Sequence, residues 1–401
     1  MAKDKDKISI GFTGDIAFDE YTSNYYNNPN KIDKKLLDFL NKNDYNVVDL
    51  ESPVTFCDET EKEALMHKME PKHVEYVKEI INNPIADIAN NHMMDYGYQG
   101  LYDTIDNLNK SEVPFIGAGR TLDEASKYIV VGDNVKVGII AIQYKDYYIA
   151  TPESAGPFHD SYLNLLQDRI SEMKTKADWV VVVYHGGEEF LTVPMPYTKK
   201  VLHKILKYGA DVVVAHHPHV VQGYELIGKK AIFYSLGNFI FDTDFQRAQK
   251  YTDSGVLLSI TFTKDEFEFD SKLLKIDRKG EKIDLYEGKS KFKEVKKKGY
   301  HKLWTKEAVR IREISNNKKK LRKTRITKFV SDGKQNKMVP FSYFEKKIDK
   351  NTKIKLSIEH NEGGILRKIK RHRYTRLLKE CISNKKYRYY AYARILHIFN
   401  K

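Results

Sequence analysis

The first 240 residues alternate between short apolar runs and amphipathic stretches. The apolar runs span residues 8–13, 45–50, 85–89, 135–143, 179–184, 212–215 and 231–234. Runs of this length that are rich in Val and Ile are typical of buried strands. Apolar side chains at helical spacing occupy residues 32–40, 71–81, 100–109, 162–174 and 197–208. Strands that alternate with helices predict an α/β fold whose sheet strands are largely parallel.

The pattern changes in the last third of the chain. Residues 256–262 and 267–276 are expected to be antiparallel edge strands, and the alternation disappears from residue 289 onward. We therefore expect a domain over residues 7–288 and an extension over residues 289–401. Apolar positions within residues 365–399 favour basic helices, so the extension is predicted to be mainly helical.

Charge separates the same two regions. Residues 290–401 hold 35 Lys and Arg against 9 Asp and Glu, whereas the preceding residues hold 34 basic and 46 acidic side chains. A basic extension of this kind suits an anionic polymer or an anionic membrane surface as partner. A merely solvated basic face explains the same composition equally well. Nucleic acid is a weaker candidate, because the extension carries no recognisable nucleic-acid-binding motif.

Short polar motifs follow the apolar runs, and their order along the chain is informative. They are Thr13-Gly14-Asp15, Leu50-Glu51, Ala89-Asn90-Asn91-His92, Tyr184-His185-Gly186-Gly187, His216-His217-Pro218-His219 and Ser235-Leu236-Gly237-Asn238-Phe239. An open α/β sheet gathers the carboxyl ends of its strands at one crevice. Carboxylate and amide oxygens beside imidazoles suit Mn, Fe or Zn. The motifs therefore predict a site for one or two divalent ions.

Together with Asp95, Gly97, Glu189 and Gln222, these motifs resemble the CapA family of capsule-synthesis proteins over roughly residues 7–265. That family is associated with poly-γ-glutamate capsule and is similar in fold to calcineurin-like metallophosphoesterases. The resemblance implies a calcineurin-like, metallophosphatase-type α/β sandwich. It also implies a metal-dependent hydrolase or transferase that acts in the biosynthesis of capsule or another surface polymer.

The resemblance further implies which side chains bind the metal. The expected ligands are Asp15, Glu51, Asn91, His185, His217 and His219. Glu51 would be the carboxylate that bridges two ions, as in two-metal hydrolases. Phosphoesterases of this fold carry a histidine where this chain has Ala17, and CapA-type proteins also lack it. Asp49 stands where the family usually has Asn.

Three further residues are assigned to catalysis by the same resemblance. His92 would face the substrate as an acid or an electrostatic stabiliser, which suits an imidazole near neutral pH. Asp95 could orient His92, and Glu189 could bind substrate or water. His216 is not assigned as a ligand. The remaining histidines, including His67 and His203, are expected to be structural or solvated.

Other reaction classes are not supported by the sequence. It contains no Gly-x-Ser-x-Gly elbow and no Walker motif, which argues against a serine hydrolase and a P-loop ATPase. The substrate is expected to be a phosphoester or an anionic polymer with γ-glutamyl bonds. A competing hypothesis is a non-catalytic accessory protein of polymer synthesis that acts through its basic extension.

The sequence also predicts a compartment. Cys57 and Cys381 lie far apart and indicate no disulfide framework. Residues 1–7 are charged and lack the apolar segment of a secretory signal. No window approaches the ~20 apolar residues of a membrane span. We therefore expect a cytoplasmic protein that could contact the inner membrane face through residues 289–401.

Overall fold

The computed structural model of the chain describes residues 6–60, 65–144, 148–289 and 292–295, together with residues 300, 307, 310 and 314 and the strand positions 330–331 and 336–337. The chain divides into two units, Met1–Tyr300 and His301–Lys401, and each is described by itself. The helices expected within residues 365–399 lie outside the described residues. The domain boundary expected between residues 288 and 289 stays a prediction.

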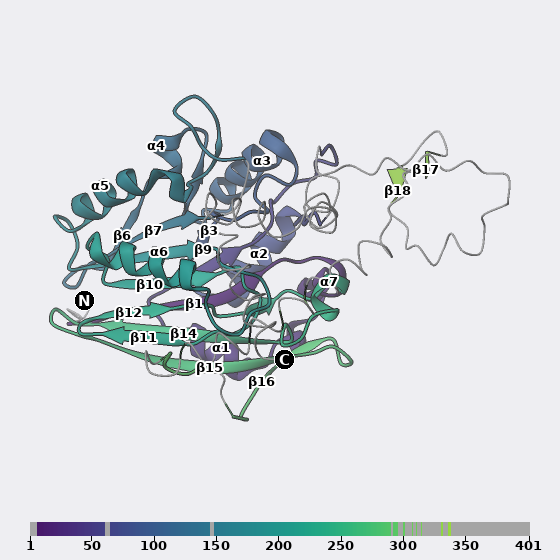
Figure 1. Ribbon diagram of the computed structural model, residues 1–401. Helices are drawn as coiled ribbons and strands as arrows, with labels where there is room; N and C mark the ends of the chain where they lie inside the picture. Colours follow the sequence, from purple (N-terminus) through teal and green to yellow (C-terminus); the bar gives the residue numbers. More distant parts are fainter. Residues whose placement is uncertain are drawn as a thin grey trace, which may run out of the picture. The chain divides into compact units, whose positions relative to one another are not determined.

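The first unit contains an eight-stranded mixed sheet. The strand order is β16-β15-β14-β1-β2-β3-β4, and β13 pairs with the end of β1 (Figure 1). The bounds are β1 Ile8–Ile16, β2 Tyr45–Leu50, β3 Pro84–Asp87, β4 Phe115–Ile116, β13 Asn238–Ile240, β14 Ser254–Phe262, β15 Phe267–Asp277 and β16 Lys282–Leu285. Strands β1 to β4 and β13 are parallel, whereas β14, β15 and β16 join them in antiparallel pairs.

A second sheet of six strands has the order β11-β12-β10-β9-β7-β6. The bounds are β6 Ile129–Val131, β7 Val137–Gln143, β9 Trp179–His185, β10 Val212–His216, β11 Tyr224–Ile227 and β12 Lys230–Phe233. The four central strands are parallel, and β6 and β11 close the two edges in antiparallel pairs. Buried Val and Ile dominate β7, β9 and β10, as expected of strands covered on both faces.

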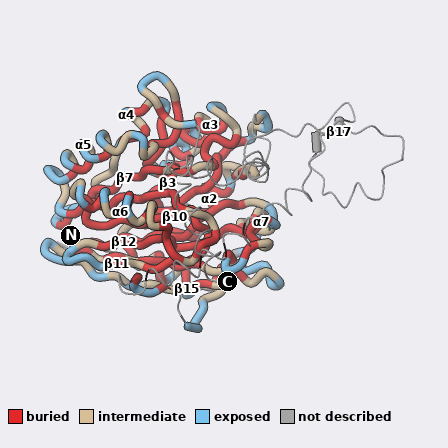
Figure 2. The backbone as a smooth tube through the Cα atoms, viewed as in Figure 1, coloured by how far each residue is buried: buried red, intermediate tan, exposed pale blue. Residues whose placement is uncertain are grey.

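The two sheets pack face to face, and helices cover their outer faces. The helices are α1 Lys34–Leu40, α2 Pro71–Ile80, α3 Gly97–Lys110, α5 Leu163–Met173 and α6 Pro196–Lys207. Helices α1, α2 and α3 share an apolar cluster with β2 and β3, and α5 and α6 share another with β7 and β9. A third cluster fills the space between the sheets. Figure 2 shows the buried strands in the interior and exposed residues on the outer helices.

Shorter elements complete the first unit. They are α4 Leu122–Ala125, α7 Asp244–Arg247, the strand pair β5 Ala118–Gly119 and β8 Gly156–Pro157, and the 3-10 turns Glu20–Thr22, Tyr25–Asn27, Pro29–Lys31 and Asp160–Tyr162. In the second unit, β17 Val330–Ser331 pairs antiparallel with β18 Asn336–Lys337.

This architecture confirms the α/β sandwich expected from the sequence. The edge strands differ from expectation, because β14 and β15 lie inside the first sheet and β16 forms its edge. Strands β6, β11 and β16 were not anticipated, since each has only three or four residues. Among the described residues, no helix combines the length and the apolarity that a membrane crossing requires.

Residues beyond β16 still contribute to the sandwich. The Phe292 ring lies 5.2 Å from the Tyr224 ring between centroids, and the Val295 amide donates to the Tyr224 carbonyl at 2.7 Å. The Tyr300 hydroxyl donates to the Pro194 carbonyl at 2.6 Å. The first unit is therefore completed only at about residue 300.

Candidate metal centre

The space between the sheets changes from apolar to polar at the carboxyl ends of the parallel strands. Successive strand residues point to opposite faces, so the residue two positions after an inward Val or Ile also points inward. At this level the alternation turns inward Asp49 and Asp87 on the first sheet, and Gln143, His185 and His216 on the second. Asp15 joins them because the register of β1 against β2 shifts between Phe12 and Asp15. We call these six residues the polar layer. Each is at most 1% exposed.

Asp15 reaches the site because β1 and β13 approach each other closely. The register of β1 against β2 shifts between Phe12 and Asp15, and the Asp15 amide donates to the Gly237 carbonyl at 2.9 Å. A Cβ on Gly14 would lie only 2.3 Å from that carbonyl oxygen. A glycine is therefore required before Asp15 if the two strands are to keep this contact.

The Asn90-Asn91-His92 segment is tied to β2 beside Glu51. The Asn90 amide group donates to the Leu50 carbonyl at 2.8 Å, and its side-chain oxygen accepts from the His92 amide at 3.2 Å. Asn90 is thus a structural residue that places its two neighbours. Asn91 Oδ1 lies 3.0 Å from His185 Nε2, which joins this loop to the second sheet.

The His217-Pro218-His219 turn has a strained backbone. His217 and His219 have φ values of 91° and 56°, in a region that residues other than glycine seldom adopt. Such strain is concentrated at functional sites, where the surrounding structure enforces it. The two imidazole centroids lie 5.9 Å apart, and both rings belong to buried residues.

Three groups of side chains could each hold a metal ion among the described residues. They are Glu51 with His217 and His219, Asp49 with Glu51 and His185, and Asp15 with Asp49 and His216. Within each group the potential ligand atoms lie within 4.8 Å of one another. Glu51 and Asp49 each belong to two of these groups, so Glu51 lies between two potential sites, as the bridging role expected for it requires. Asn91 adds its oxygen beside His185.

Glu51 supplies the strongest argument for a cation. Both of its carboxylate oxygens are buried and accept no hydrogen bond from the residues that the structure describes. Three imidazole nitrogens approach Oε1 without hydrogen-bond geometry: His185 Nε2 at 3.4 Å, His219 Nε2 at 3.6 Å and His92 Nε2 at 4.0 Å. Buried polar groups are almost always satisfied. A carboxylate without a donor that faces imidazole nitrogens has the donor set of a divalent metal site.

The charges in this interior strongly influence one another. Burial raises the pKa of Glu51, and burial with the charge of Asp49 raises the pKa of Asp87 to about 8. Burial also acts on Asp15, but hydrogen bonds with His216 and His219 outweigh it and hold its pKa well below the usual range. Burial lowers the pKa of His219, but the charge of Glu51 and the hydrogen bond and charge of Asp15 contribute more in the opposite direction, and the pKa is raised to about 9. The carboxylates thus attract cations, whether imidazolium or metal.

The residues assigned to catalysis lie at the same place. His92 Nδ1 is 2.7 Å from Asp95 Oδ2, which leaves His92 Nε2 directed to the Glu51 side. The partly buried Glu189 follows Gly187, whose φ of 123° re-aims the chain after β9. Glu189 is close enough to raise the pKa of His219. The structure therefore gathers all nine residues named from the sequence at one edge of the sandwich.

The sequence left the roles of several supporting side chains open. Asp49 Oδ2 lies 2.9 Å from His185 Nδ1. It therefore fixes the orientation of the ring and leaves Nε2 as the nitrogen that can bind a metal. His216 Nδ1 lies 3.2 Å from Asp15 Oδ1, and Asn238 Oδ1 lies 3.0 Å from His219 Nδ1. The alternation of inward positions along β2 and β10 could have identified Asp49 and His216 in advance.

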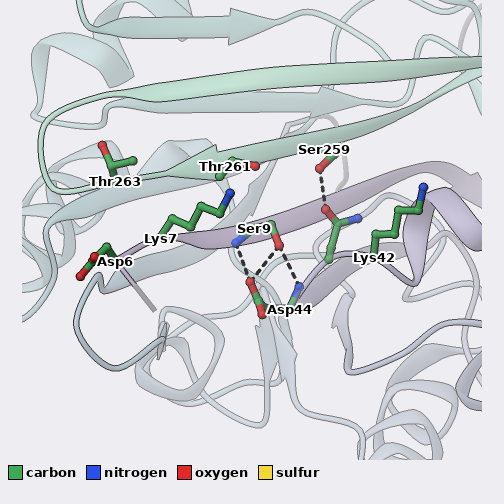
Figure 3. A pocket seen from close by; sticks show the side chains of 9 residues that line it. Asp6, Lys7, Ser9, Lys42, Asp44, Ser259, Thr261 and Thr263 are labelled. Atoms are coloured by element: carbon green, nitrogen blue, oxygen red, sulfur yellow. Dashed lines mark hydrogen bonds between the residues drawn. The ribbon is translucent and has the colours of Figure 1, made fainter. Parts of the chain in front are cut away.

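A cavity of about 620 Å³ lies elsewhere in the first unit (Figure 3). It opens beside the amino-terminal end of β1, and its lining includes Ser9, Lys42, Asp44 and Thr261. Asp44 Oδ2 accepts hydrogen bonds from the Ser9 amide at 2.9 Å and from the Ser9 hydroxyl at 2.8 Å. No histidine lines the cavity, so it is separate from the metal groups.

Comparison with known proteins identifies the family. Residues 9–243 match the family described as bacterial capsule synthesis protein PGA_cap. The chain is 31% identical over 253 residues to the PGA biosynthesis protein CapA of Bacillus subtilis (strain 168), which covers 61% of this chain and 66% of that protein. It is 30% identical over 262 residues to the capsule biosynthesis protein CapA of Bacillus anthracis, covering 62% and 63% respectively.

A solved structure of a hypothetical protein from Thermus thermophilus aligns with a TM-score of 0.44 and 14% identity, over 67% of this chain and 99% of that one. The chain spans slightly less than two thirds of the length of the two CapA relatives. The family match covers more than half of the chain and includes Asp15, Glu51, Asn91 and the histidine turn. The chain therefore belongs to the family of bacterial capsule synthesis proteins described as PGA_cap.

Proposed function

We propose that the chain is a metal-dependent hydrolase or transferase that acts on phosphoester or γ-glutamyl bonds in the biosynthesis of capsule or another surface polymer. The observation that carries this proposal is Glu51, a fully buried carboxylate without a hydrogen-bond donor that faces three imidazoles. The relatives named for capsule and PGA biosynthesis support the polymer as the biological context.

In such a site some side chains would bind the metal and others would orient the ligands. Glu51, Asn91, His185, His217, His219 and Asp15 would hold one or two ions of Mn, Fe or Zn. A bound divalent ion supplies Lewis acidity and lowers the pKa of water toward neutrality. Asp49 fixes His185 through Nδ1, and Asn238 fixes His219 in the same way. These contacts orient the ligands before an ion binds.

His92 is placed to move a proton. Asp95 accepts a hydrogen bond from Nδ1 at 2.7 Å, which fixes the ring and leaves Nε2 on the Glu51 side. A positioned imidazole can protonate a leaving oxygen or nitrogen, and general acid catalysis of this kind contributes about 10²–10⁴-fold in rate. The same placement serves phosphoester hydrolysis and γ-glutamyl transfer.

The proposal is tested by activity of the Mn-loaded protein on an aryl phosphate, a phosphodiester and oligo-γ-glutamate. We expect turnover of at least one substrate and a loss of about 100-fold or more in kcat for His92→Ala. His203→Ala is the matched control, since His203 on α6 pairs with Glu225 on β11 and belongs to none of the metal groups. Activity that survives both His92→Ala and His217→Ala would refute the proposal.

A second candidate function rests on charge. Residues 301–401 contain 30 Lys and Arg against 8 Asp and Glu. We propose that this unit binds an anionic polymer or an anionic membrane surface, since basic segments are attracted to such surfaces. The two functions are compatible, because one unit could perform the chemistry while the other keeps it near the polymer or the membrane.

A further inference from the structure

A second histidine–aspartate pair lies beside His92 and Asp95. His67 Nδ1 is 2.7 Å from Asp19 Oδ2, and the His67 backbone amide donates to Asp95 Oδ2 at 2.7 Å. The same Asp95 oxygen also accepts from His92 Nδ1 at 2.7 Å. Asp95 therefore links the two imidazoles, and each ring is oriented through Nδ1 by its own carboxylate.

The ring contacts place His67 on the metal side of the molecule. The His67 and His92 rings meet edge to face with centroids 4.3 Å apart. The other side of His67 contacts the Phe241 ring at 5.0 Å, and Phe241 contacts the His219 ring at 5.0 Å. A chain of ring contacts thus runs from the proposed proton donor His92 through His67 and Phe241 to the proposed ligand His219.

The loop that carries His67 is held at both of its ends. The Thr55 amide donates to the Met69 carbonyl, and the Met69 amide donates to the Pro53 carbonyl, both at 2.9 Å. The Thr60 hydroxyl donates to the Asp95 carbonyl at 2.6 Å. His67 itself is buried, with only 8% of its surface exposed.

The remaining ring nitrogen of His67 is available to a ligand. No hydrogen bond joins Nε2 to another group among the described residues, and Nε2 is not among the fully buried polar atoms without a partner. Burial lowers the pKa of His67, but the hydrogen bond and charge of Asp19 together with the charges of Asp95 and Glu51 outweigh burial, so the pKa is raised and the cationic form is favoured. Two adjacent imidazoles held through Nδ1 form a suitable donor pair for an oxyanion.

We propose that His67 is a second substrate-facing imidazole that, together with His92, binds the oxyanion group of the substrate next to the metal groups. The oxyanion is a phosphoryl group or a carboxylate. The inference rests on the proposed function, since it assigns the substrate side of the same site. It departs from the expectation that His67 is a structural or solvated histidine. Asp19 is the positioning residue that holds His67 in place.

Calorimetric titration of the full-length Mn-loaded protein tests this, with inorganic phosphate in one arm and tri-γ-glutamate in the other. A charge-assisted hydrogen bond corresponds to an affinity change of about tenfold or more. We expect His67→Gln to weaken binding of the preferred probe by at least about tenfold while the Mn content stays that of the wild type. Asp19→Asn should weaken it by about threefold to tenfold, and His203→Gln should leave it unchanged.

The outcomes separate this inference from the proposed function. Unchanged probe affinity in His67→Gln with normal Mn content would overturn the inference and leave the metal site standing, as would wild-type protein that binds Mn but neither probe. Loss of Mn in His67→Gln would also overturn it, because His67 would then support the metal ligands. Wild-type protein without Mn would refute the proposed function itself. If His67→Gln does not fold, Asp19→Asn decides, since the Asp19 side chain is 29% exposed and thus less buried than that of His67.

Discussion

Individual residues at this site are held by contacts that the sequence reveals only in part. Of the nine residues named from the sequence, seven belong to polar motifs that follow apolar runs, whereas Asp95 and Glu189 were named through the family resemblance. Asp49 and His216 were harder to assign, since a shift of one residue in strand register would turn either side chain to the opposite face. His67 belongs to a loop without periodic pattern, and only the folded structure brings it to His92.

Replacement of Glu51 by glutamine shows separately how the buried carboxylate affects the stability of the fold and how it affects the binding of Mn. Glu51→Gln keeps the shape and removes a buried carboxylate that has no hydrogen-bond donor. We expect the metal-free protein to become more stable, since a buried carboxylate that accepts no hydrogen bond is costly. We also expect Mn to raise the melting temperature of the wild type but not of the variant. Thermal unfolding with and without Mn measures both effects, and an equal Mn-induced shift in the two proteins would refute the role of Glu51.

The buried Asp160, which belongs to none of the metal groups, should make the stability of the fold depend on pH. Burial raises its pKa to about 7, and the neighbouring His159 Nδ1, 3.6 Å away, has its own pKa lowered by burial. A raised pKa means that the folded state takes up a proton. Ionisation of Asp160 should therefore cost no free energy of unfolding below about pH 4, where the group is protonated in both states, and should lower that free energy as pH rises to about 7. At about 1.4 kcal/mol per pKa unit, the decline is on the order of 2–4 kcal/mol.

Urea unfolding at pH 5 and pH 8 measures this dependence. Asp160→Asn should remove that part of the pH dependence, whereas Asp168→Asn on the exposed face of α5 should not. A pH dependence that is unchanged in Asp160→Asn would show that its carboxyl group is not the cause.

At the scale of elements, the site depends on how closely β1 and β13 approach. The sequence predicted most strands and helices to within a few residues, because apolar runs and helical periodicity extend over their whole length. It did not predict β6, β11 and β16, which are too short to show a period. Nor could it predict the pairing of β13 with β1, since this contact joins Asp15 to Asn238, far apart in the chain.

Gly14→Ala tests this contact between strands. The new Cβ would lie 2.3 Å from the Gly237 carbonyl oxygen, so β13 or the end of β1 must move. We expect a loss of about 1–3 kcal/mol in stability and a weaker affinity for Mn, because Asp15 and Asn238 move with these strands. Gly228→Ala is the control: no atom lies within 4 Å of its Cβ, and only its φ of 60° opposes the change.

Denaturant unfolding and Mn titration of both glycine variants distinguish the outcomes. The control should lose about 1 kcal/mol and keep its Mn affinity. Equal Mn affinity in Gly14→Ala and the wild type would contradict the account of how Asp15 is positioned.

At the scale of the whole molecule, two regions of opposite charge are joined in one chain. The first unit is completed by Phe292, Val295 and Tyr300, so a cut at residue 289 would remove part of its packing. The charge asymmetry was readable from composition alone. The structure of the extension was not, since charge runs do not specify which faces pack together.

Truncation after residue 300 tests the role of the basic unit. It removes 30 Lys and Arg and 8 Asp and Glu and keeps all residues of the first unit, Met1–Tyr300. We expect the truncated protein to keep its Mn content and to lose binding to vesicles with anionic lipid and to poly-γ-glutamate. Binding of the full chain should fall steeply with salt, as expected when charges in water are screened. Cosedimentation at two salt concentrations measures this, and equal binding by both forms would exclude the extension as the binding unit.

If this edge of the sandwich is a metal site, the protein should retain bound ions, and elemental analysis measures how many ions each chain holds. Full-length protein is loaded with Mn, separated from free metal by gel filtration, and compared with the double variant His185→Ala/His217→Ala and with His203→Ala. We expect one to two ions per chain in the wild type and in His203→Ala, and none in the double variant. Wild-type protein that retains no metal, or a double variant that retains as much as the wild type, would contradict it.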